Sequence, residues 1–405
     1  MSFIRRNLEN QVTKAARAFG ALVLTGPRCS GKTSLLRQLF PNAGYYLFED
    51  PDIVGRFRAD PQGFLDSIKT PVILDEIQNV PELFNFIRSR IDRFPQRKGQ
   101  WLLTGSQESG LMQNVSESMA GRAAVLQLLP LALSETPKVS LLKGGYPEVL
   151  QRPRNASLWF ASYLQTYLER DVRSISAVQD LSKFRRFMAL LATRHASVLN
   201  KTDLAAPLGM SVPGISNWLD ILEATGLIML VPPYFENFGK RLIKSPKLYW
   251  VDSGLVCHLL SIESEAALER SPFLGALFEG WVAAEIAKSQ VNAGRRRELY
   301  YFRDQQGLEV DFIMPAPASK TRAAGMWMLE AKASRSPSAD MARPMLVLAK
   351  SWPTGLNAQP LAGSWLVHRP ARHHVDSTAL AAGVKAITVE QLSKQLSKQS
   401  SIVLQ

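Results

Sequence analysis

The chain has 405 residues, a length that favours two or three compact domains over a single core. Hydrophobic residues make up 46% of the chain and charged residues 20%, which excludes wholesale disorder. No stretch approaches the roughly 20 uninterrupted apolar residues that cross a bilayer, and the N-terminus has no apolar signal core, so we expect a cytoplasmic protein without a membrane partner.

A formal net charge of +13 predicts a polyanionic partner. The basic residues are spread along the chain instead of forming one juxtamembrane cluster, which favours DNA over anionic lipid. A basic surface that is only solvated is the alternative. The two cysteines, Cys29 and Cys257, lie far apart without metal-ligand spacing, so neither a disulfide framework nor a zinc site is indicated.

A phosphate-binding loop is predicted near the N-terminus, between an apolar strand at 21–25 and a helical pattern that follows it. Two glycines permit a tight loop whose N–H groups converge on phosphate oxygens. We expect Lys32 to reach the β- and γ-phosphates and the Thr33 hydroxyl to complete a Mg²⁺ shell. The predicted nucleotide-binding residues of this loop are Gly26, Pro27, Arg28, Cys29, Ser30, Gly31, Lys32, Thr33 and Ser34.

Two adjacent carboxylates follow the next apolar run, at 72–76, as in a Walker B strand. Asp75 is expected to hold Mg²⁺ through water, and Glu76 to act as the general base that polarises the attacking water. The alternative for this pair is a helix N-cap. Gln78 follows closely enough to contact the same water or report the nucleotide state.

Two other strand ends carry polar residues. A strand at 45–48 ends in Glu49-Asp50, which we expect to cap the next segment, although the pair could face the site. A strand at 101–104 places Thr104 and Ser106 at the carboxyl end of the sheet, where open α/β sheets bind ligands. Either hydroxyl could sense the γ-phosphate, and either could be a turn residue.

These features resemble a known family, the AAA-type P-loop ATPases of bacteria and archaea. The matching runs are Leu-Asp-Glu-Ile-Gln at 74–78, Leu-Thr-Gly-Ser at 103–106, Ala-Gly-Arg at 120–122 and Leu-Pro-Leu at 129–131. The resemblance implies an α/β ATPase core at 1–135 that uses ATP and Mg²⁺.

In such proteins an arginine often reaches the γ-phosphate of a neighbouring subunit. Arg122 is the first candidate for this catalytic role and Arg170 the second, and a homo-oligomer would follow. For each of them a structural ion pair is the alternative.

The middle of the chain is predicted to be helical. The spacing of Trp159, Tyr163 and Tyr167 predicts an amphipathic helix in a lid or linker at 136–195. Next come a helix at 201–208, a turn at Gly209 and a second helix.

The second helix, at 212–224, is followed by strands at 227–231 and 247–251 around the basic residues Lys240, Arg241 and Lys244. This order predicts a winged helix-turn-helix at 196–255. DNA binding and protein docking are both open for it.

Carboxylates also gather in the last third of the chain. Glu279 lies on a predicted helix, Asp311 on a strand at 309–312, and Glu330 and Lys332 on the next strand. With a side-chain period of two, Glu330 and Lys332 share one face, and Asp311 can converge on them. Asp311 and Glu330 could bind Mg²⁺ or Mn²⁺ while Lys332 stabilises charge on a phosphodiester. The alternative is a Glu–Lys contact on an exposed strand pair.

This second pattern resembles the PD-(D/E)XK nuclease superfamily, whose fold is similar to the domain that usually accompanies this ATPase family. The resemblance implies a restriction-endonuclease-like domain at 256–405, either active or decayed, although the usual proline ahead of Asp311 is missing. Further strands are expected at 345–348 and 364–367, and a frayed helix at the end.

Together these features predict an α/β protein in which ATP hydrolysis is coupled to DNA binding or remodelling, with metal-dependent DNA cleavage as a further possibility. A second hypothesis is a nucleotide-dependent switch that binds a protein partner and carries an inert nuclease-like domain. A third is a nuclease with a regulatory ATPase.

Overall fold

The computed structural model describes residues 3–105, 119–167, 180–234, 243–318, 324–353, 359–370 and 379–402. The chain forms two compact units. The first contains Met1–Leu131 with two short segments, Asp220–Leu227 and Val291–Arg295, and the second contains the remainder. No described helix is both long and apolar enough to cross a membrane.

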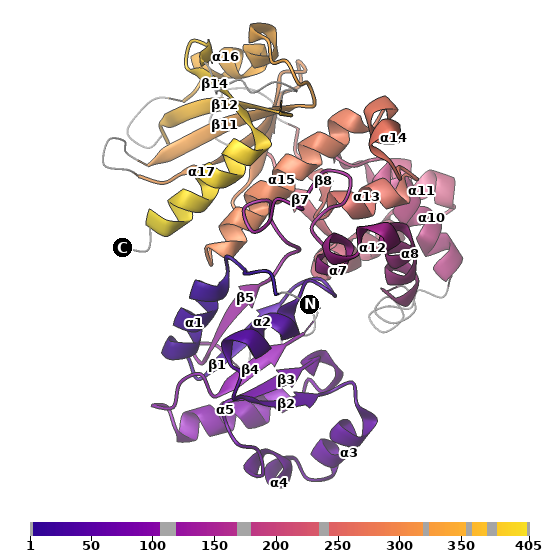
Figure 1. Ribbon diagram of the computed structural model, residues 1–405. Helices are drawn as coiled ribbons and strands as arrows, with labels where there is room; N and C mark the ends of the chain where they lie inside the picture. Colours follow the sequence, from indigo (N-terminus) through magenta and orange to yellow (C-terminus); the bar gives the residue numbers. More distant parts are fainter. Residues whose placement is uncertain are drawn as a thin grey trace. The chain divides into compact units, whose positions relative to one another are not determined.

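The first unit is built on a parallel sheet with the strand order β2-β3-β4-β1-β5 (Figure 1). Three of its strands are wholly buried because their apolar runs are covered on both faces. This parallel sheet confirms the expected α/β class. The strands are β1 (Ala21–Thr25), β2 (Gly44–Leu47), β3 (Val72–Asp75), β4 (Trp101–Thr104) and β5 (Ala123–Gln127).

Two apolar clusters cover the two faces of this sheet, because alternate strand residues point to opposite sides. One cluster joins the sheet to α1 (Glu9–Ala18) and α2 (Lys32–Leu39). The other joins it to α3 (Pro51–Ala59), α4 (Pro61–Asp66) and α5 (Leu83–Arg93). The strand ends, where the polar residues lie, are thereby fixed between two helical layers.

The second unit begins with α7 (Pro147–Gln151) and α8 (Ala156–Tyr167). The aromatic stripe of α8 is core: the rings of Trp159 and Tyr163 stack at 5.1 Å, and both contact Tyr146. The chain continues through α10 (Leu181–Ala192), α11 (Lys201–Leu208) and α12 (Val212–Ala224), of which residues 220–224 belong to the first unit. The last two helices have the predicted bounds, and the turn between them contains Gly209 with a positive φ of 58°.

A small antiparallel sheet with the order β6-β8-β7 accompanies these helices. Its strands are β6 (Ser197–Val198), β7 (Ile228–Val231) and β8 (Lys247–Trp250). β8 is central, because its residues pair with both neighbours. The predicted wing residues Lys240 and Arg241 lie outside the described residues, whereas Lys244 is described.

The rest of the second unit carries a six-stranded mixed sheet with the order β13-β14-β12-β11-β10-β9. Antiparallel pairing of Phe312 with Leu329 brings the preceding Asp311 opposite Glu330. The strands are β9 (Tyr300–Arg303), β10 (Glu309–Ala316), β11 (Gly325–Lys332), β12 (Leu361–His368), β13 (Ala379–Ala381) and β14 (Val384–Thr388). The helices are α13 (Ser253–Leu259), α14 (Glu265–Arg270), α15 (Leu274–Asn292), α16 (Arg343–Lys350) and α17 (Val389–Ile402).

The strand predicted at 345–348 is wrong, because these residues belong to α16. Pro344 lies in the first turn of the helix, where its missing N–H costs nothing. Met345 and Leu348, three residues apart, are the buried positions. Because all four residues at 345–348 are apolar, the helical spacing of the buried positions could not be recognised in the sequence.

Candidate functional site

The phosphate loop connects β1 to α2 and has a backbone that only glycine adopts readily at two positions. Gly26 has a φ of 135°, and a Cβ there would lie 2.2 Å from the carbonyl oxygen of Leu128. Gly31 has a φ of 98° and directly precedes α2. These two residues let the loop turn tightly at the carboxyl end of β1, so that the first N–H groups of α2 border it.

Lys32 lies folded against this loop. Its ammonium group donates to the carbonyl oxygens of Gly26 and Pro27, at 3.0 Å each, and the residue is only 6% exposed. Burial lowers the pKa of Lys32. Next to it the hydroxyl of Ser30 is buried, with no hydrogen-bond partner among the described residues. A cation and a donor are thus available where the sequence predicts phosphate binding.

An arginine that sequence reasoning missed supports the loop from outside. The guanidinium of Arg6 donates to the carbonyl oxygens of Ser30, at 2.9 Å, and Leu129, at 2.7 Å. Arg6 is 5% exposed. It therefore joins the phosphate loop to the segment that follows β5. No motif marks this residue, because it lies twenty residues ahead of the loop.

Asp75, at the end of β3, is the centre of a hydroxyl cluster. Its Oδ2 accepts hydrogen bonds from the hydroxyls of Thr33 and Tyr45, at 2.8 Å each, and its Oδ1 accepts one from Thr104. The carboxylate is 4% exposed. The structure thus brings three of the predicted residues together and adds Tyr45, which the sequence offered only as a member of an apolar strand. A carboxylate beside a threonine hydroxyl is a donor set that suits Mg²⁺.

Glu76 leaves the strand and adopts a left-handed backbone with a φ of 57°. Such a conformation is costly for a residue other than glycine and is often found at functional sites. The amide of Gln78 donates to its Oε2 at 2.5 Å, and a guanidinium nitrogen of Arg28 lies 4.0 Å from the same oxygen. Arg28 also pairs with Glu49 at 3.4 Å. Asp50 is the N-cap of α3 and accepts a hydrogen bond from Asp52, as expected for a capping residue.

Arg122 lies at the amino ends of the strands, whereas the phosphate loop lies at their carboxyl ends. It precedes β5, whose first residue pairs in parallel with Ala21, the first residue of β1. The phosphate loop follows the last residue of β1, so Arg122 is not part of the nucleotide site of its own chain. Its guanidinium forms two hydrogen bonds with Asp92, at 2.5 and 3.0 Å. Ser106 and Arg170 lie outside the described residues.

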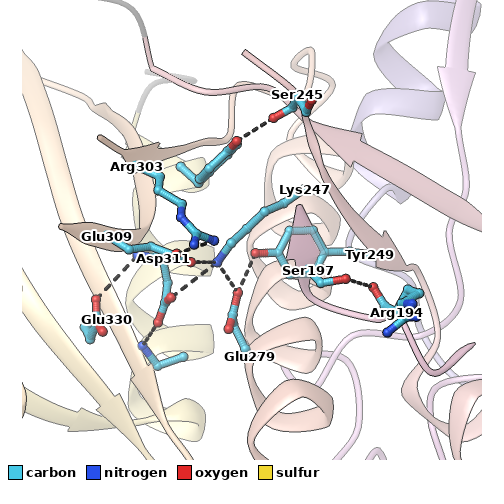
Figure 2. A network of polar contacts seen from close by, with 12 residues as sticks. Arg194, Ser197, Ser245, Lys247, Tyr249, Glu279, Arg303, Glu309, Asp311 and Glu330 are labelled. Atoms are coloured by element: carbon cyan, nitrogen blue, oxygen red, sulfur yellow. Dashed lines mark hydrogen bonds and ion pairs between the residues drawn. The ribbon is translucent and has the colours of Figure 1, made fainter. Parts of the chain in front are cut away.

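A second cluster, in the second unit, surrounds the ammonium group of Lys247 on β8 (Figure 2). This nitrogen lies 2.9 Å from Glu279, 2.5 Å from Glu309 and 3.5 Å from Asp311. The side chain of Lys247 is 2% exposed. The hydroxyl of Tyr249 donates to the same oxygen of Glu279 at 2.6 Å. The sequence predicted the carboxylates but not the lysine, which appeared only as the start of a strand.

The predicted residues of β11 border this cluster. Asp311 accepts a hydrogen bond from the N–H of Ala331 at 3.0 Å, and the N–H of Asp311 points to Glu330 at 3.4 Å. Lys332 donates to Glu330 at 2.6 Å, which is the Glu–Lys contact of the alternative hypothesis, but the strand pair is buried instead of exposed. Asp311, Glu330 and Lys332 are therefore adjacent, as the side-chain alternation predicts.

Burial and crowding shift the pKa values of this cluster. Burial, together with the Asp311 carboxylate, raises the pKa of Glu279 to about 7 and that of Glu330 to about 8. Burial alone would lower the pKa of Lys247, but Tyr249 and the surrounding carboxylates raise it well above its ordinary value. Lys247 is therefore charged, and it neutralises part of the negative charge around it.

The donor set of the second cluster does not fit a divalent cation as the side chains are arranged. The sequence predicts Asp311 and Glu330 as the metal ligands, but the Lys247 ammonium lies 3.5 Å from Asp311 and the Lys332 ammonium donates to Glu330 at 2.6 Å, so cations already contact both carboxylates. Among the described residues, no group of three or more His, Cys, Asp or Glu side chains has the arrangement of a metal site.

Residues 18–136, which include the phosphate loop and the Asp75-Glu76 pair, match an AAA domain. Residues 135–266 and 274–369 match two domains of unknown function, DUF8612 and DUF4143. An uncharacterized protein of Mycobacterium tuberculosis is 32% identical over 317 residues, which cover 76% of this chain and 71% of that protein. The chain belongs to the family of this mycobacterial protein. An uncharacterized protein of Mycobacterium bovis matches to the same extent.

A solved structure of a Walker-type ATPase of Pyrococcus abyssi is also similar, with 14% identity and a TM-score of 0.43. The similarity covers 64% of this chain and 96% of that one. The AAA match and the parallel sheet identify the first unit as a P-loop ATPase core that binds nucleotide, in agreement with the resemblance seen in the sequence.

Proposed function

We propose that the first unit hydrolyses ATP with Mg²⁺ and that hydrolysis is coupled to DNA binding by the second unit. The observation that carries the first part is the position of Asp75, which accepts hydrogen bonds from the phosphate-loop Thr33 and from Thr104. Three separate segments of the AAA fold thus meet at one carboxylate, at the carboxyl edge of the sheet where such folds bind ligands.

Each residue then has a distinct role. Lys32 leaves its contacts with the loop carbonyls and binds the β- and γ-phosphates, and the loop N–H groups bind phosphate oxygens. Thr33 and Asp75 hold Mg²⁺, which neutralises charge on the phosphates. Glu76, held by Gln78, accepts the proton of the attacking water. Thr104 links the next strand to the metal-binding carboxylate.

The coupling to DNA is supported by the arrangement around β8. Helices α10, α11 and α12 and the order β6-β8-β7 are the elements that a winged helix requires. Ser211, which directly precedes α12, and Asn217, in the second turn of the helix, are exposed and offer polar groups to a phosphate backbone. The net charge of +13 supports the same partner.

The ATPase proposal is tested by turnover and nucleotide binding of three variants. Glu76→Gln should lower kcat by about a hundredfold to ten-thousandfold and still bind ATP. Lys32→Ala should lose ATP affinity. Glu82→Gln, which removes an exposed carboxylate that pairs with Arg58, is the matched control and should retain turnover. Normal turnover in Glu76→Gln would overturn the assignment of the general base.

The DNA part has its own test. Turnover and DNA affinity are measured at low and high salt with single-stranded, duplex and branched DNA. Stimulation that is lost at high salt is expected. If DNA changes neither ATP turnover nor ATP affinity at low salt, the coupling is wrong and the second hypothesis, in which ATP occupancy gates a protein partner, is favoured. One observation favours this second function: Lys247 takes the centre of the carboxylate cluster that DNA cleavage would need.

A further inference from the structure

Lys247 comes from the small sheet, yet its ammonium group lies among carboxylates of other elements. Glu279 belongs to α15, and Glu309 and Asp311 belong to β10 (Figure 2). We propose that this ammonium group replaces a divalent cation in the cluster, so that the cluster is an ion-pair lock between β8 and the six-stranded sheet and not a metal-dependent hydrolytic centre.

The backbone holds Lys247 in this position. β8 is the central strand of its sheet, with Lys247 opposite Val198 on one side and Val231 on the other. The next two residues of the strand, Leu248 and Tyr249, are fully buried. The two strand pairings fix the backbone of Lys247, and its side chain, which is 2% exposed, is enclosed beside the carboxylates.

The chain on both sides of the connection between β7 and β8 is also attached to the six-stranded sheet. The N–H of Tyr234 donates to the carbonyl of Tyr301 at 2.8 Å, and the N–H of Ile243 donates to the carbonyl of Arg303 at 3.1 Å. The main chain is therefore anchored to β9 after β7 and before β8, and Lys247 attaches β8 to α15 and β10.

Tyr249 reinforces the lock. It lies two residues after Lys247 and so faces the same side of the strand. Its hydroxyl and the Lys247 ammonium both donate to one oxygen of Glu279, at 2.6 and 2.9 Å. This oxygen is occupied by two donors from β8 and has little remaining capacity for a metal ion.

The charges explain why a cation is needed here. Four carboxylates gather, and three cations contact them: Lys247, Lys332 through Glu330, and Arg303 through Glu309. Without Lys247, the carboxylates of Glu279, Glu309 and Asp311 lose the ammonium group that all three contact, which leaves the position of one cation to be filled. The cluster should therefore bind a divalent cation when Lys247 is replaced.

The test uses the full chain without nucleotide, so its outcome does not depend on ATP hydrolysis. Lys247→Met keeps a long side chain and removes the charge. In EDTA its Tm should fall, and Mn²⁺ should restore the Tm by binding the folded cluster. Any change that Mn²⁺ causes in the Tm of the wild type should be the same in Asp311→Asn. Mn²⁺ binding followed by electron paramagnetic resonance should be at least about tenfold tighter in Lys247→Met than in the wild type.

Two variants keep the test specific. Adding Asp311→Asn to Lys247→Met should abolish the rescue. Lys288→Met is the matched control, since Lys288 is also 2% exposed and forms an ion pair with Glu285, at 3.2 Å, outside the Lys247 cluster. Its Tm should fall without any rescue by Mn²⁺.

The proposal is overturned if wild-type protein binds Mn²⁺ at a site that Asp311→Asn removes, or if it cleaves DNA with Mn²⁺ and loses this activity in Asp311→Asn. Both measurements use folded wild-type protein, so they decide the matter even if Lys247→Met does not fold. Lys247→Met that folds but gains no Mn²⁺ affinity also contradicts it.

Discussion

The hydroxyl of Tyr45 lies 2.8 Å from Oδ2 of Asp75, the same oxygen that accepts a hydrogen bond from the phosphate-loop Thr33. Tyr45 comes from β2, at the edge of the sheet, and the guanidinium of Arg37 stacks on its ring at 3.8 Å. Burial and the hydrogen bond to Asp75 raise the pKa of Tyr45 to about 12, so the hydroxyl is a donor throughout the physiological range. Tyr45 thus orients the carboxylate that is proposed to hold Mg²⁺.

Tyr45→Phe should raise the Mg²⁺ concentration for half-maximal ATPase activity by about tenfold, because a hydrogen bond to a charged group contributes about 1.5 to 3 kcal/mol. ATP affinity measured in EDTA should not change. Tyr46→Phe is the control, since Tyr46 packs its ring against Phe64 instead. An equal effect in both variants would mean that β2, and not the hydroxyl, is responsible.

Arg122 is proposed to act in a neighbouring subunit, because it lies at the amino edge of its own sheet. Arg122→Ala should then lower kcat by about a thousandfold. Mixing Arg122→Ala with Lys32→Ala should restore part of the activity. At a mixed interface the Arg122→Ala subunit supplies an intact phosphate loop and the Lys32→Ala subunit supplies an intact arginine.

Asp92→Ala is the control for this prediction, since Asp92 is the ion-pair partner of Arg122. It should retain turnover. If it loses as much activity as Arg122→Ala and mixing restores nothing, the ion pair is structural and the proposed role in trans is wrong.

Gly280 of α15 faces His195, and a Cβ at this position would lie 1.7 Å from the Nε2 atom of the imidazole. Gly280→Ala should therefore destabilise the second unit by about 1 to 3 kcal/mol or more through overpacking. Gly275→Ala in the same helix is the control, because nothing lies within 4 Å of its Cβ position. It should stabilise by up to about 1 kcal/mol. Urea unfolding of the two variants measures the difference, and equal stabilities would contradict the predicted clash.

Stability should depend on pH through the carboxylate cluster. The pKa of Glu279 is raised from 4.5 to about 7 and that of Glu330 to about 8, so between these values the folded chain binds protons that the unfolded chain has released. The free energy of unfolding should therefore fall as the pH rises from about 4.5 to about 8, by at most about 1.4 kcal/mol per pH unit for each group.

Glu330→Gln should flatten this dependence, because one of the two groups no longer titrates. Urea unfolding of wild type and variant at about pH 5 and about pH 8 tests it. Stability that rises with pH over this interval in the wild type, or an unchanged slope in the variant, would contradict the raised pKa of Glu330.

The sequence predicts those features of the fold and the site whose residues lie close together along the chain. The phosphate loop and the carboxylates of 75–76 can be recognised because glycine, lysine and acidic residues have a fixed spacing around buried strands. Helices α11 and α12 are predictable because Asn200 caps the first and glycines mark the turns. These features depend on local backbone chemistry, which a single sequence displays.

What it does not predict is convergence between distant segments. Tyr45 and Lys247 lie in short strands whose pattern indicates only a sheet, and Arg6 lies ahead of the first recognisable motif. Their partners are thirty or more residues away, except Ser30, which is twenty-four away. The sequence predicts Asp311 and Glu330 as metal ligands, but the tertiary fold places the Lys247 ammonium group against the same cluster of carboxylates. This contact cannot be recognised in the sequence.

The contacts of Arg6 have a practical consequence for dissecting this protein. The recognisable AAA region begins at residue 18, yet Arg6 and all of α1 except its last residue lie before it. A fragment cut at that boundary would lose both hydrogen bonds that tie Ser30 and Leu129 together, and with them the helix that covers one face of β1. We expect such a fragment to retain every signature residue and yet to bind nucleotide poorly, so a negative result from it would not apply to the full chain.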